Sequence, residues 1–188
     1  MESETLTSFQ RETLLNLAAE AIDHQLSQRR PLPVEHLDYD AALQARRATF
    51  VTLHLQQQLR GCIGILEAHQ PLVNDVAYNA QAAAFQDPRF SPVSAREASQ
   101  LEIQISVLSA SEEMRFSSEQ DLIAQLRTGV DGLILEEGET HRGTFLPSVW
   151  QQVPSPGVFL KHLKQKAQLP PDYWSETLRV YRYTTESF

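Results

Sequence analysis

The stretch TFVTLHLQQQLRGCIGI, residues 49–65, decides the fold that we expect for this chain. Apolar and polar side chains alternate in residues 49–55 and again in residues 59–65, which is typical of two half-buried β-strands. The three glutamines at 56–58 separate the strands and are expected to form the loop between them. The stretch therefore predicts an antiparallel hairpin.

The second strand of this hairpin carries the only cysteine of the chain. Because side chains alternate across a strand, we expect Arg60 and Cys62 on one face. The opposite face, which packs inward, carries the aliphatic side chains Leu59, Ile63 and Ile65. With a three-residue loop, His54 lies opposite Arg60 and diagonal to Cys62. A loop one residue shorter moves His54 out of that pairing.

The surroundings of Cys62 suggest chemistry, and they also fit a plain core residue. Gly61 and Gly64 remove bulk beside the thiol, so a ligand or another backbone can approach closely. A nearby positive charge favours the reactive thiolate, which makes Cys62 a candidate catalytic residue, as nucleophile or redox group. The alternative is that Cys62 fills a small core site, as free cysteines often do. For His54 the alternative is an exposed strand histidine.

Helix and strand patterns alternate along the rest of the first half. Thr7 and Gln10 form a capping-box pattern that begins an N-terminal helix over residues 8–29. Small and aliphatic side chains in residues 72–84 predict a second helix with a closely packed face. Residues 101–108 alternate strictly and predict a strand with one wet face.

The second half repeats the plan of the first. Residues 132–147 predict another hairpin, turning at Gly138 and leading to a helical turn that begins with proline, and a helix is expected from Ser118 to Gly129. Placing LRGCIG over HRGTFL aligns Arg60-Gly61 with Arg142-Gly143. The alignment predicts an internal repeat of hairpin plus helix, and chance recurrence of an Arg-Gly pair is the alternative.

Length and composition set the fold class. A chain of 188 residues with 41% hydrophobic side chains can bury one good core. We therefore expect a single α+β domain over residues 1–188, with mainly antiparallel strands and packed helices. It should have two lobes, one around the hairpin at 49–66 and one around the hairpin at 132–147.

Charge and cysteine content exclude several classes of protein. Sixteen basic and 24 acidic residues give a net charge of -8, which repels phosphate backbones and anionic membranes, so nucleic-acid binding is not expected. A single cysteine forms no internal disulfide, and no apolar run reaches the roughly 18 residues that span a bilayer. The N-terminus MESETLTSFQRETLL lacks the pattern of a signal peptide. These features predict a cytoplasmic protein.

Arg60 and Arg142 are candidate ligand-binding residues. A guanidinium beside a glycine can bind a carboxylate or phosphate through two parallel hydrogen bonds, and arginines from related hairpins can face one pocket. The alternative is that each arginine pairs with an acidic neighbour such as Asp87 or Asp131. We expect neither a metal nor a cofactor, because the histidines and the cysteine lack metal-ligand spacing and no glycine-rich phosphate loop is present.

Residues 155–169 predict a helix that carries all three lysines of the chain, Lys161, Lys164 and Lys166. We interpret it as an amphipathic helix whose solvated face is basic and includes Lys161 and Lys164. The alternative is a surface that docks an acidic partner.

Six sequence blocks in order resemble the AMMECR-type family, the protein A component of AmmeMemoRadiSam systems. The blocks are FVTL with LRGCIG, AAAFQDPRF with SPV, LEIQISVLS, GVDGLILE, RGTFLPSVW and FLKHLKQKAQL. Order and spacing match from about Thr49 to the C-terminus, with the N-terminal helix fitting more loosely. The family's signature residues correspond here to Arg60, Gly61, Cys62, Ile63, Gly64, Asp87, Pro88, Arg89, Phe90, Arg142, Gly143, Leu146 and Pro147.

The resemblance implies a two-lobed α+β protein built around antiparallel strands. In prokaryotes such proteins occur beside a Memo-like protein, related to extradiol dioxygenases, and a radical-SAM protein, which implies that these are partners in one pathway. The resemblance brings no assigned reaction. It adds Asp87 and Arg89 to Arg60, Gly61, Gly64 and Arg142 as candidate ligand-binding residues. In this family the usual hairpin turn is glycine or asparagine, and the QQQ sequence departs from it.

Two functions of different classes remain open. In the first, the protein is a binding module that holds a small anionic ligand or a pathway partner near the LRGCIG strand. In the second, it is an enzyme component in which Cys62 does nucleophilic or redox work on a small anionic substrate. A concave, partly exposed Cys62 with converging polar groups favours the enzyme, and a flat surface or a packed cysteine favours the binding module.

Overall fold

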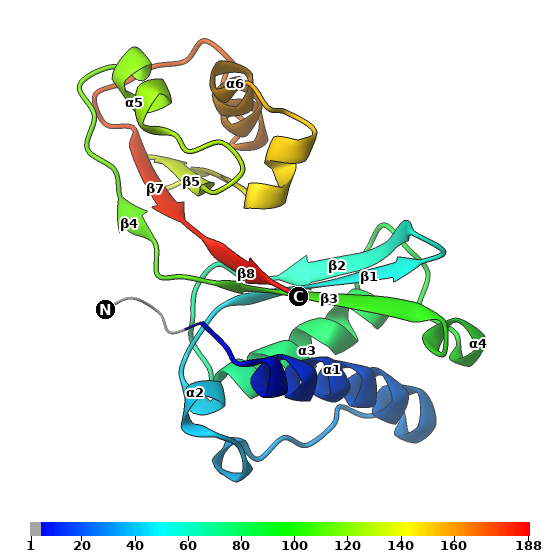
Figure 1. The fold of residues 1–188 in the computed structure, drawn as a ribbon. Helices are drawn as coiled ribbons and strands as arrows, with labels where there is room; N and C mark the ends of the chain where they lie inside the picture. The colour runs from blue at the N-terminus through cyan, green and yellow to red at the C-terminus, as the bar shows by residue number, and fades with distance from the viewer. Residues whose placement is uncertain (1–4) are drawn as a thin grey trace. The chain divides into compact units, whose positions relative to one another are not determined.

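A computed structural model describes residues 5–188 as two compact units, each with its own sheet and core (Figure 1). The first unit runs to Leu108 and includes Glu186–Phe188, and the second unit is Ser109–Thr185. Each sheet has four strands. The predicted α+β fold with antiparallel strands is confirmed. No helix in residues 5–188 combines the length and the apolar character needed to cross a membrane.

The first sheet has the strand order β2-β1-β3-β8. Its strands are β1 (Thr49–Leu55), β2 (Gln58–Gly64), β3 (Leu101–Leu108) and β8 (Thr185–Ser187). Two long helices, α1 (Ser8–Gln28) and α3 (Leu72–Phe85), lie side by side on one face of the sheet (Figure 1). The short elements of this unit are η1 (His36–Asp38), α2 (Ala41–Gln44) and α4 (Ala95–Ala98).

Local sequence explains both long helices. The predicted capping box is present, because the Thr7 side chain accepts from the Gln10 N–H and the Gln10 side chain accepts from the Thr7 N–H. The alanines of α3 are buried, which lets the helix approach both α1 and the sheet closely. Val51 and Leu53 point from β1 into this core and are fully buried. The wet face predicted for β3 is also present, since Glu102 and Gln104 are exposed.

The first hairpin differs from expectation at its turn. The loop has two residues, Gln56 and Gln57, and both have positive φ, at 52° and 64°. His54 therefore pairs with Leu59, and the expectation that it pairs with Arg60 was wrong. Arg60 has no partner on β1 and forms a bulge, after which Leu53 pairs with Gly61.

The bulge restores the register that a longer loop would have given. Beyond it, Thr52 lies opposite Cys62, so His54 stays diagonal to the thiol and on its face, as predicted. Strict alternation does not hold between Leu59 and Gly61. For that reason Leu59, expected in the core, is 42% exposed.

The second sheet has the strand order β4-β7-β5-β6. Its strands are β4 (Glu112–Glu113), β5 (Gly132–Glu137), β6 (His141–Phe145) and β7 (Arg179–Tyr183). Its helices are α5 (Glu119–Gln125), η2 (Pro147–Gln151) and α6 (Pro156–Lys166). In the core, Trp150 stacks on Phe159 with ring centroids 3.8 Å apart. The helix predicted to reach Gly129 ends at Gln125, because the next residue, Leu126, is extended.

One lysine of α6 lies on the side opposite to expectation. Lys164 is fully buried, so its place on a solvated basic face was wrong. Its Nζ donates to Glu119 Oε1 at 2.8 Å and lies 5.7 Å from the ring centroid of Trp174. A carboxylate and an aromatic face therefore compensate the buried charge. Lys161 and Lys166 are exposed.

The two sheets share one plan, in agreement with the predicted internal repeat. Read from the edge strand that ends each hairpin, the orders are β2-β1-β3-β8 and β6-β5-β7-β4. Gly61 pairs with Leu53, and Gly143 pairs with Leu135. Each glycine also lies against a helix of its own unit, Gly61 against Ala83 in α3 and Gly143 against the end of α6.

Candidate functional site

The thiol of Cys62 lies on the open face of the first sheet. This outer face, opposite α1 and α3, is defined by the residues that share the thiol's side of the sheet: Phe50, Thr52, His54, Leu59, Cys62, Glu102, Gln104 and Ser106. Cys62 is partly exposed, and Thr52 Oγ1 donates to its Sγ at 3.3 Å. The cysteine is therefore not packed in the core, and its sulfur has a polar neighbour.

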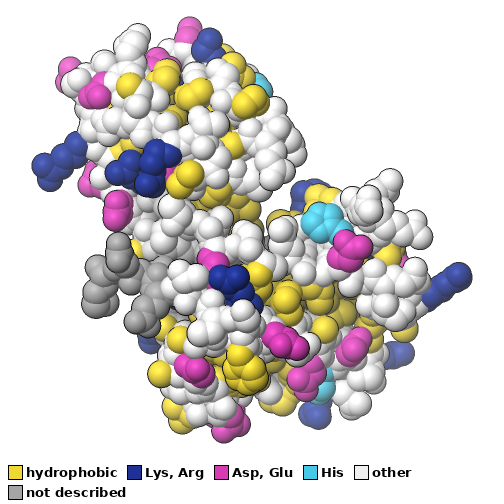
Figure 2. Space-filling model, viewed as in Figure 1, with side chains coloured by type: hydrophobic (Ala, Val, Ile, Leu, Met, Phe, Trp, Pro, Cys, Tyr) yellow, Lys and Arg dark blue, Asp and Glu magenta, His cyan; other side chains and the backbone are white. Residues whose placement is uncertain are grey.

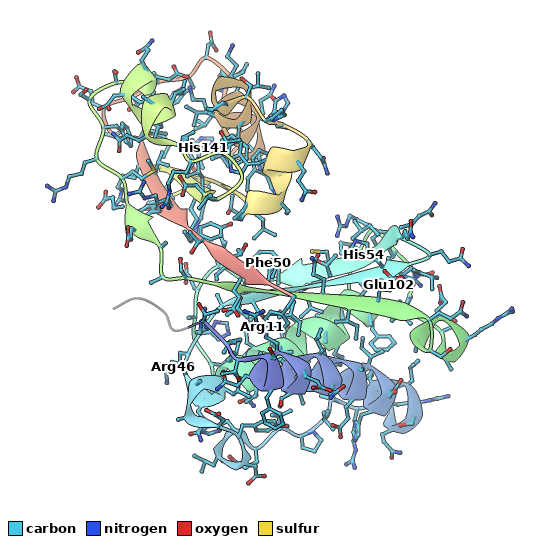
Figure 3. All side chains as sticks on the ribbon, viewed as in Figure 1. Arg11, Arg46, Phe50, His54, Glu102 and His141 are labelled. Atoms are coloured by element: carbon cyan, nitrogen blue, oxygen red, sulfur yellow. The ribbon has the colours of Figure 1, made fainter. Side chains whose placement is uncertain are left out.

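A histidine and a carboxylate extend the outer face beyond the thiol. His54 lies opposite Glu102 on β3, and Figure 3 labels both, with His54 above the β1–β2 hairpin. Figure 2 shows a histidine beside an acidic side chain on this face. Phe50 occupies the space where a side chain on Gly64 would lie. The face is thus mixed, with polar groups next to an aromatic ring.

Asp87 and Arg89 close the free edge of β2 at Cys62. The Cys62 N–H donates to Asp87 Oδ2 at 2.9 Å, and Arg89 Nη2 donates to the Cys62 carbonyl at 3.3 Å. Arg89 also donates to both Asp87 oxygens, at 3.0 and 2.7 Å. The pair makes the backbone hydrogen bonds that a further strand would make.

The ion pair at this edge is permanent at ordinary pH. Hydrogen bonds from Arg89 hold the pKa of Asp87 well below its usual range, against the opposing effect of burial, and the Cys62 N–H adds to them. The same pair raises the pKa of Arg89. The backbone of Cys62 is therefore fixed by a buried carboxylate that stays ionised.

Arg60 is engaged by a second carboxylate. Its Nε donates to Glu97 Oε1 at 2.9 Å and its Nη2 to Oε2 at 3.4 Å. The Arg60 side chain is only 12% exposed and lies over the ring of Phe90, 5.9 Å from its centroid. Hydrogen bonds from Arg60, with further ones from Ser94, lower the pKa of Glu97 to about 2. A small anion at Arg60 would have to compete with this carboxylate.

The two motif glycines make room for neighbours within the chain. A Cβ at Gly61 would collide with the carbonyl oxygen of Ala83, so Gly61 lets the α3 backbone approach β2. At Gly64 the neighbour is the ring of Phe50. The sequence predicts that either a ligand or another backbone approaches these glycines. At Gly61 the close neighbour is the backbone of α3.

Arg142 lies in the second unit. Its Nε is 3.1 Å from Glu136 Oε1, across the β5–β6 pair, and its side chain is 44% exposed. Asp131, offered above as an acidic partner, binds Arg127 instead. In the structure, Arg60 therefore pairs with Glu97, and Arg142 pairs with Glu136.

Two residues of this site were missed from the sequence. Glu97 could have been found, because Ser94 and Glu97 form a capping box, which the structure contains at the start of α4. Thr52 could also have been found, because the three-residue loop expected from the sequence already places it opposite Cys62. Within residues 5–188, no group of three His, Cys, Asp or Glu side chains is arranged to hold a metal ion.

Comparison with known proteins places these residues in a family. A family model described as AMMECR1 matches residues 15–188. A protein of Methanothermobacter thermautotrophicus is 37% identical over 182 residues, covering 94% of this chain and 92% of its own. A protein of Methanocaldococcus jannaschii is 35% identical over 158 residues, covering 80% and 76%. The crystal structure of an uncharacterised protein from Pyrococcus horikoshii superimposes with a TM-score of 0.85 at 34% identity, covering 94% of this chain and 89% of that one.

Proposed function

The chain belongs to the AMMECR1 family, and from the geometry around Cys62 we propose that it is a binding module whose outer face docks a partner protein. The observation that carries the proposal is the closed edge of β2. Asp87 and Arg89 hold the N–H and the carbonyl of Cys62, while the side chain of Cys62 faces outward. Such a strand presents its side chains on a rigid support.

The ion pairs favour a protein partner over a small anionic ligand. Arg60 and Arg89 each bind a carboxylate of the chain, Glu97 and Asp87 respectively. An anion at either guanidinium would leave a carboxylate without its counter-charge. Arg89 remains 54% exposed and can contribute a polar rim contact.

The family resemblance supplies the partner class. We propose a Memo-like protein or a radical-SAM protein of the same pathway, acting together with this protein in the cytoplasm. The outer face offers an aromatic ring at Phe50, a histidine at position 54 and hydroxyl and amide groups at Thr52 and Gln104. This mixture is typical of protein interfaces, in which aromatic side chains are enriched.

The single cysteine makes the proposal directly testable. A bulky maleimide labels Cys62 alone, and the labelled protein is expected to lose binding to whichever purified partner docks here, the Memo-like or the radical-SAM protein. The same partner is expected to slow alkylation of unlabelled Cys62 by about tenfold or more, because it covers the thiol. Binding is measured by calorimetry and alkylation by intact mass.

The matched control moves the single thiol to the helix side of the first unit. In Cys62→Ser with Ser27→Cys, the thiol lies on α1, where Ser27 is exposed. Labelling this variant should leave partner binding unchanged. Two results would refute the docking surface. In the first, neither the Memo-like protein nor the radical-SAM protein binds the unlabelled chain. In the second, the partner binds with equal affinity before and after Cys62 is labelled.

A second candidate function rests on the thiol itself. Cys62 is partly exposed and its Sγ accepts a hydrogen bond from Thr52, as a nucleophile or redox residue that reagents can reach requires. In that case Cys62→Ser abolishes the pathway's turnover while leaving partner affinity intact. Loss of affinity without loss of the chemical step would identify docking alone.

A further inference from the structure

A pocket lies on the first unit, on the part of α3 turned away from the sheet. It has a volume of about 240 Å³. The pocket is lined by residues of α3, of the turns at its two ends and of the segment between α1 and η1. They are Gln70, Asn74, Ala77, Tyr78, Gln81 and Gln86, with Pro31, Leu32 and Val34. In Figure 1 this segment passes below α1 and α3, while the sheet lies above them. We call these residues the amide pocket.

The amide pocket is separate from the outer face. Asn74, Tyr78 and Gln81 follow one another at helical spacing and so share one stripe of α3. The stripe that meets β2 is a different one, since Ala83 is the residue against Gly61. A ligand in the amide pocket therefore does not compete with a partner on the outer face.

The amide groups are held in place by the chain. Asn74 Nδ2 donates to the Val34 carbonyl at 3.1 Å and ties the segment to α3. Gln70 Nε2 donates to Asp75 at 3.0 Å, and Gln81 Nε2 donates to Gln25 at 3.2 Å. Among the described residues, the buried side-chain oxygen of Asn74 has no hydrogen-bond partner. The pocket wall thus carries oriented polar groups with unused hydrogen-bonding capacity.

The chemistry of the wall selects the class of ligand. None of the described side chains that line the pocket is charged, so it disfavours a charged group, whose burial without a counter-charge is costly. Primary amides offer a donor and an acceptor side by side, which matches the edge of a nucleobase. Tyr78, 54% exposed, offers a ring for stacking, and Pro31 and Leu32 add apolar surface.

The volume limits the ligand's size. Pockets for drug-sized molecules measure about 300–1,000 Å³, so about 240 Å³ suits a single base with part of its sugar. We propose that the amide pocket binds the base of a neutral nucleoside, held by the amides and stacked on Tyr78. The net charge of -8 agrees with a nucleoside and not with an oligonucleotide.

Titration of the isotopically labelled full chain tests this proposal by amide NMR spectra. Adenosine, guanosine, cytidine and uridine are the probes, and free ribose is the control ligand. At least one nucleoside is expected to shift the amide signals of residues 70–86 in a saturable manner, while ribose does not. Tyr78→Ala is expected to weaken that binding about tenfold, because the stacking surface is lost.

Phe9→Ala is the matched control variant, because Phe9 is an exposed aromatic residue of the same unit, at 75% exposure, and does not line the pocket. It should bind the nucleoside as the parent protein does. The proposal is overturned by any of three results: no nucleoside shifts α3 at millimolar concentration, ribose produces the same shifts, or Tyr78→Ala binds unchanged.

Discussion

Ion pairs at single residues decide how the LRGCIG motif is held. Asp87 is buried and bonded to both Arg89 and the Cys62 backbone, whereas Glu97 covers the guanidinium of Arg60. The positive charges of Arg60 and Arg89 are therefore compensated by carboxylates of the same chain. The side of β2 that faces outward is the one that carries the Cys62 thiol. That division of roles follows from the bulge, which takes Arg60 out of the strand's alternation.

The Arg60–Glu97 pair predicts a specific loss of stability in acid. The folded pKa of Glu97 is about 2, lowered from 4.5, so its contribution is complete above pH 4.5 and disappears as the pH falls towards 2. Glu97→Gln keeps a capping side chain and removes the charge. It is expected to cost about 1–3 kcal/mol at neutral pH, measured by urea unfolding.

The difference between Glu97→Gln and the parent should shrink across that acid window, because the parent loses the charge there and the variant has none to lose. Glu139→Gln, in the exposed loop between β5 and β6, is the matched control for loss of one charge. Parallel stability curves for the parent and Glu97→Gln would contradict the assignment of Glu97 as the acid-sensitive partner.

At the level of elements, periodicity predicted most of the fold and failed where geometry departs from it. The capping box of α1, the two hairpins and the wet face of β3 follow from side-chain spacing, and the structure contains them. The bulge at Arg60 and the burial of Lys164 break that spacing. Arg60 and Lys164 bind Glu97 and Glu119, which lie 37 and 45 positions away in the sequence, beyond the reach of a local pattern.

The candidate site was also predicted in part, and its long-range contacts were not. The sequence predicted Cys62 on a face with His54, and it singled out Asp87 and Arg89 through the family resemblance. It could not show that Asp87 and Arg89 close the strand edge at Cys62, because that contact joins residues 25 positions apart. The ligand-binding role expected for Arg60, Gly61, Gly64, Asp87, Arg89 and Arg142 remains a prediction.

The turn of the first hairpin predicts a stabilising substitution. Gln56 and Gln57 both adopt left-handed backbone conformations, which cost a residue with a Cβ about 1–2 kcal/mol, and such turns favour Asn-Gly. The double variant Gln56→Asn, Gln57→Gly is expected to raise the free energy of unfolding by about 1 kcal/mol. Gln58→Asn, at the first residue of β2, is the control and should give no gain. Unchanged or lower stability of the double variant would show that the turn is not strained.

At the level of the whole chain, the two repeats exchange their last strands. β3 of the first sheet runs on into β4 of the second, and β7 of the second runs on into β8 of the first. Where the two segments pass, the Ser109 N–H donates to the Thr184 carbonyl and the Thr184 N–H donates to Ser109 Oγ, both at 2.9 Å. Each sheet is thus completed by chain from the other half of the sequence.

This exchange predicts that the last residues stabilise the first unit although they follow the second in sequence. Ile105 and Phe188 exchange backbone hydrogen bonds at 2.8 and 3.1 Å. Glu186 accepts from the Leu6 N–H and from Arg11. Removing residues 186–188 is expected to speed hydrogen exchange in β3 and α1 by about tenfold or more, because these bonds, together worth about 1–3 kcal/mol, are lost.

Tryptophan fluorescence reports on unfolding of the second unit, because the two tryptophans of the chain, Trp150 and Trp174, both lie there. Their fluorescence should follow an unchanged urea transition in the shortened protein while exchange in the first unit rises. Ser187→Ala is the control, because it removes only the 2.9 Å contact between Ser106 and Ser187 and keeps the strand. If the tryptophan transition shifts and exchange in β3 does not, β8 stabilises the second unit, and the exchanged strand is not what completes the first sheet.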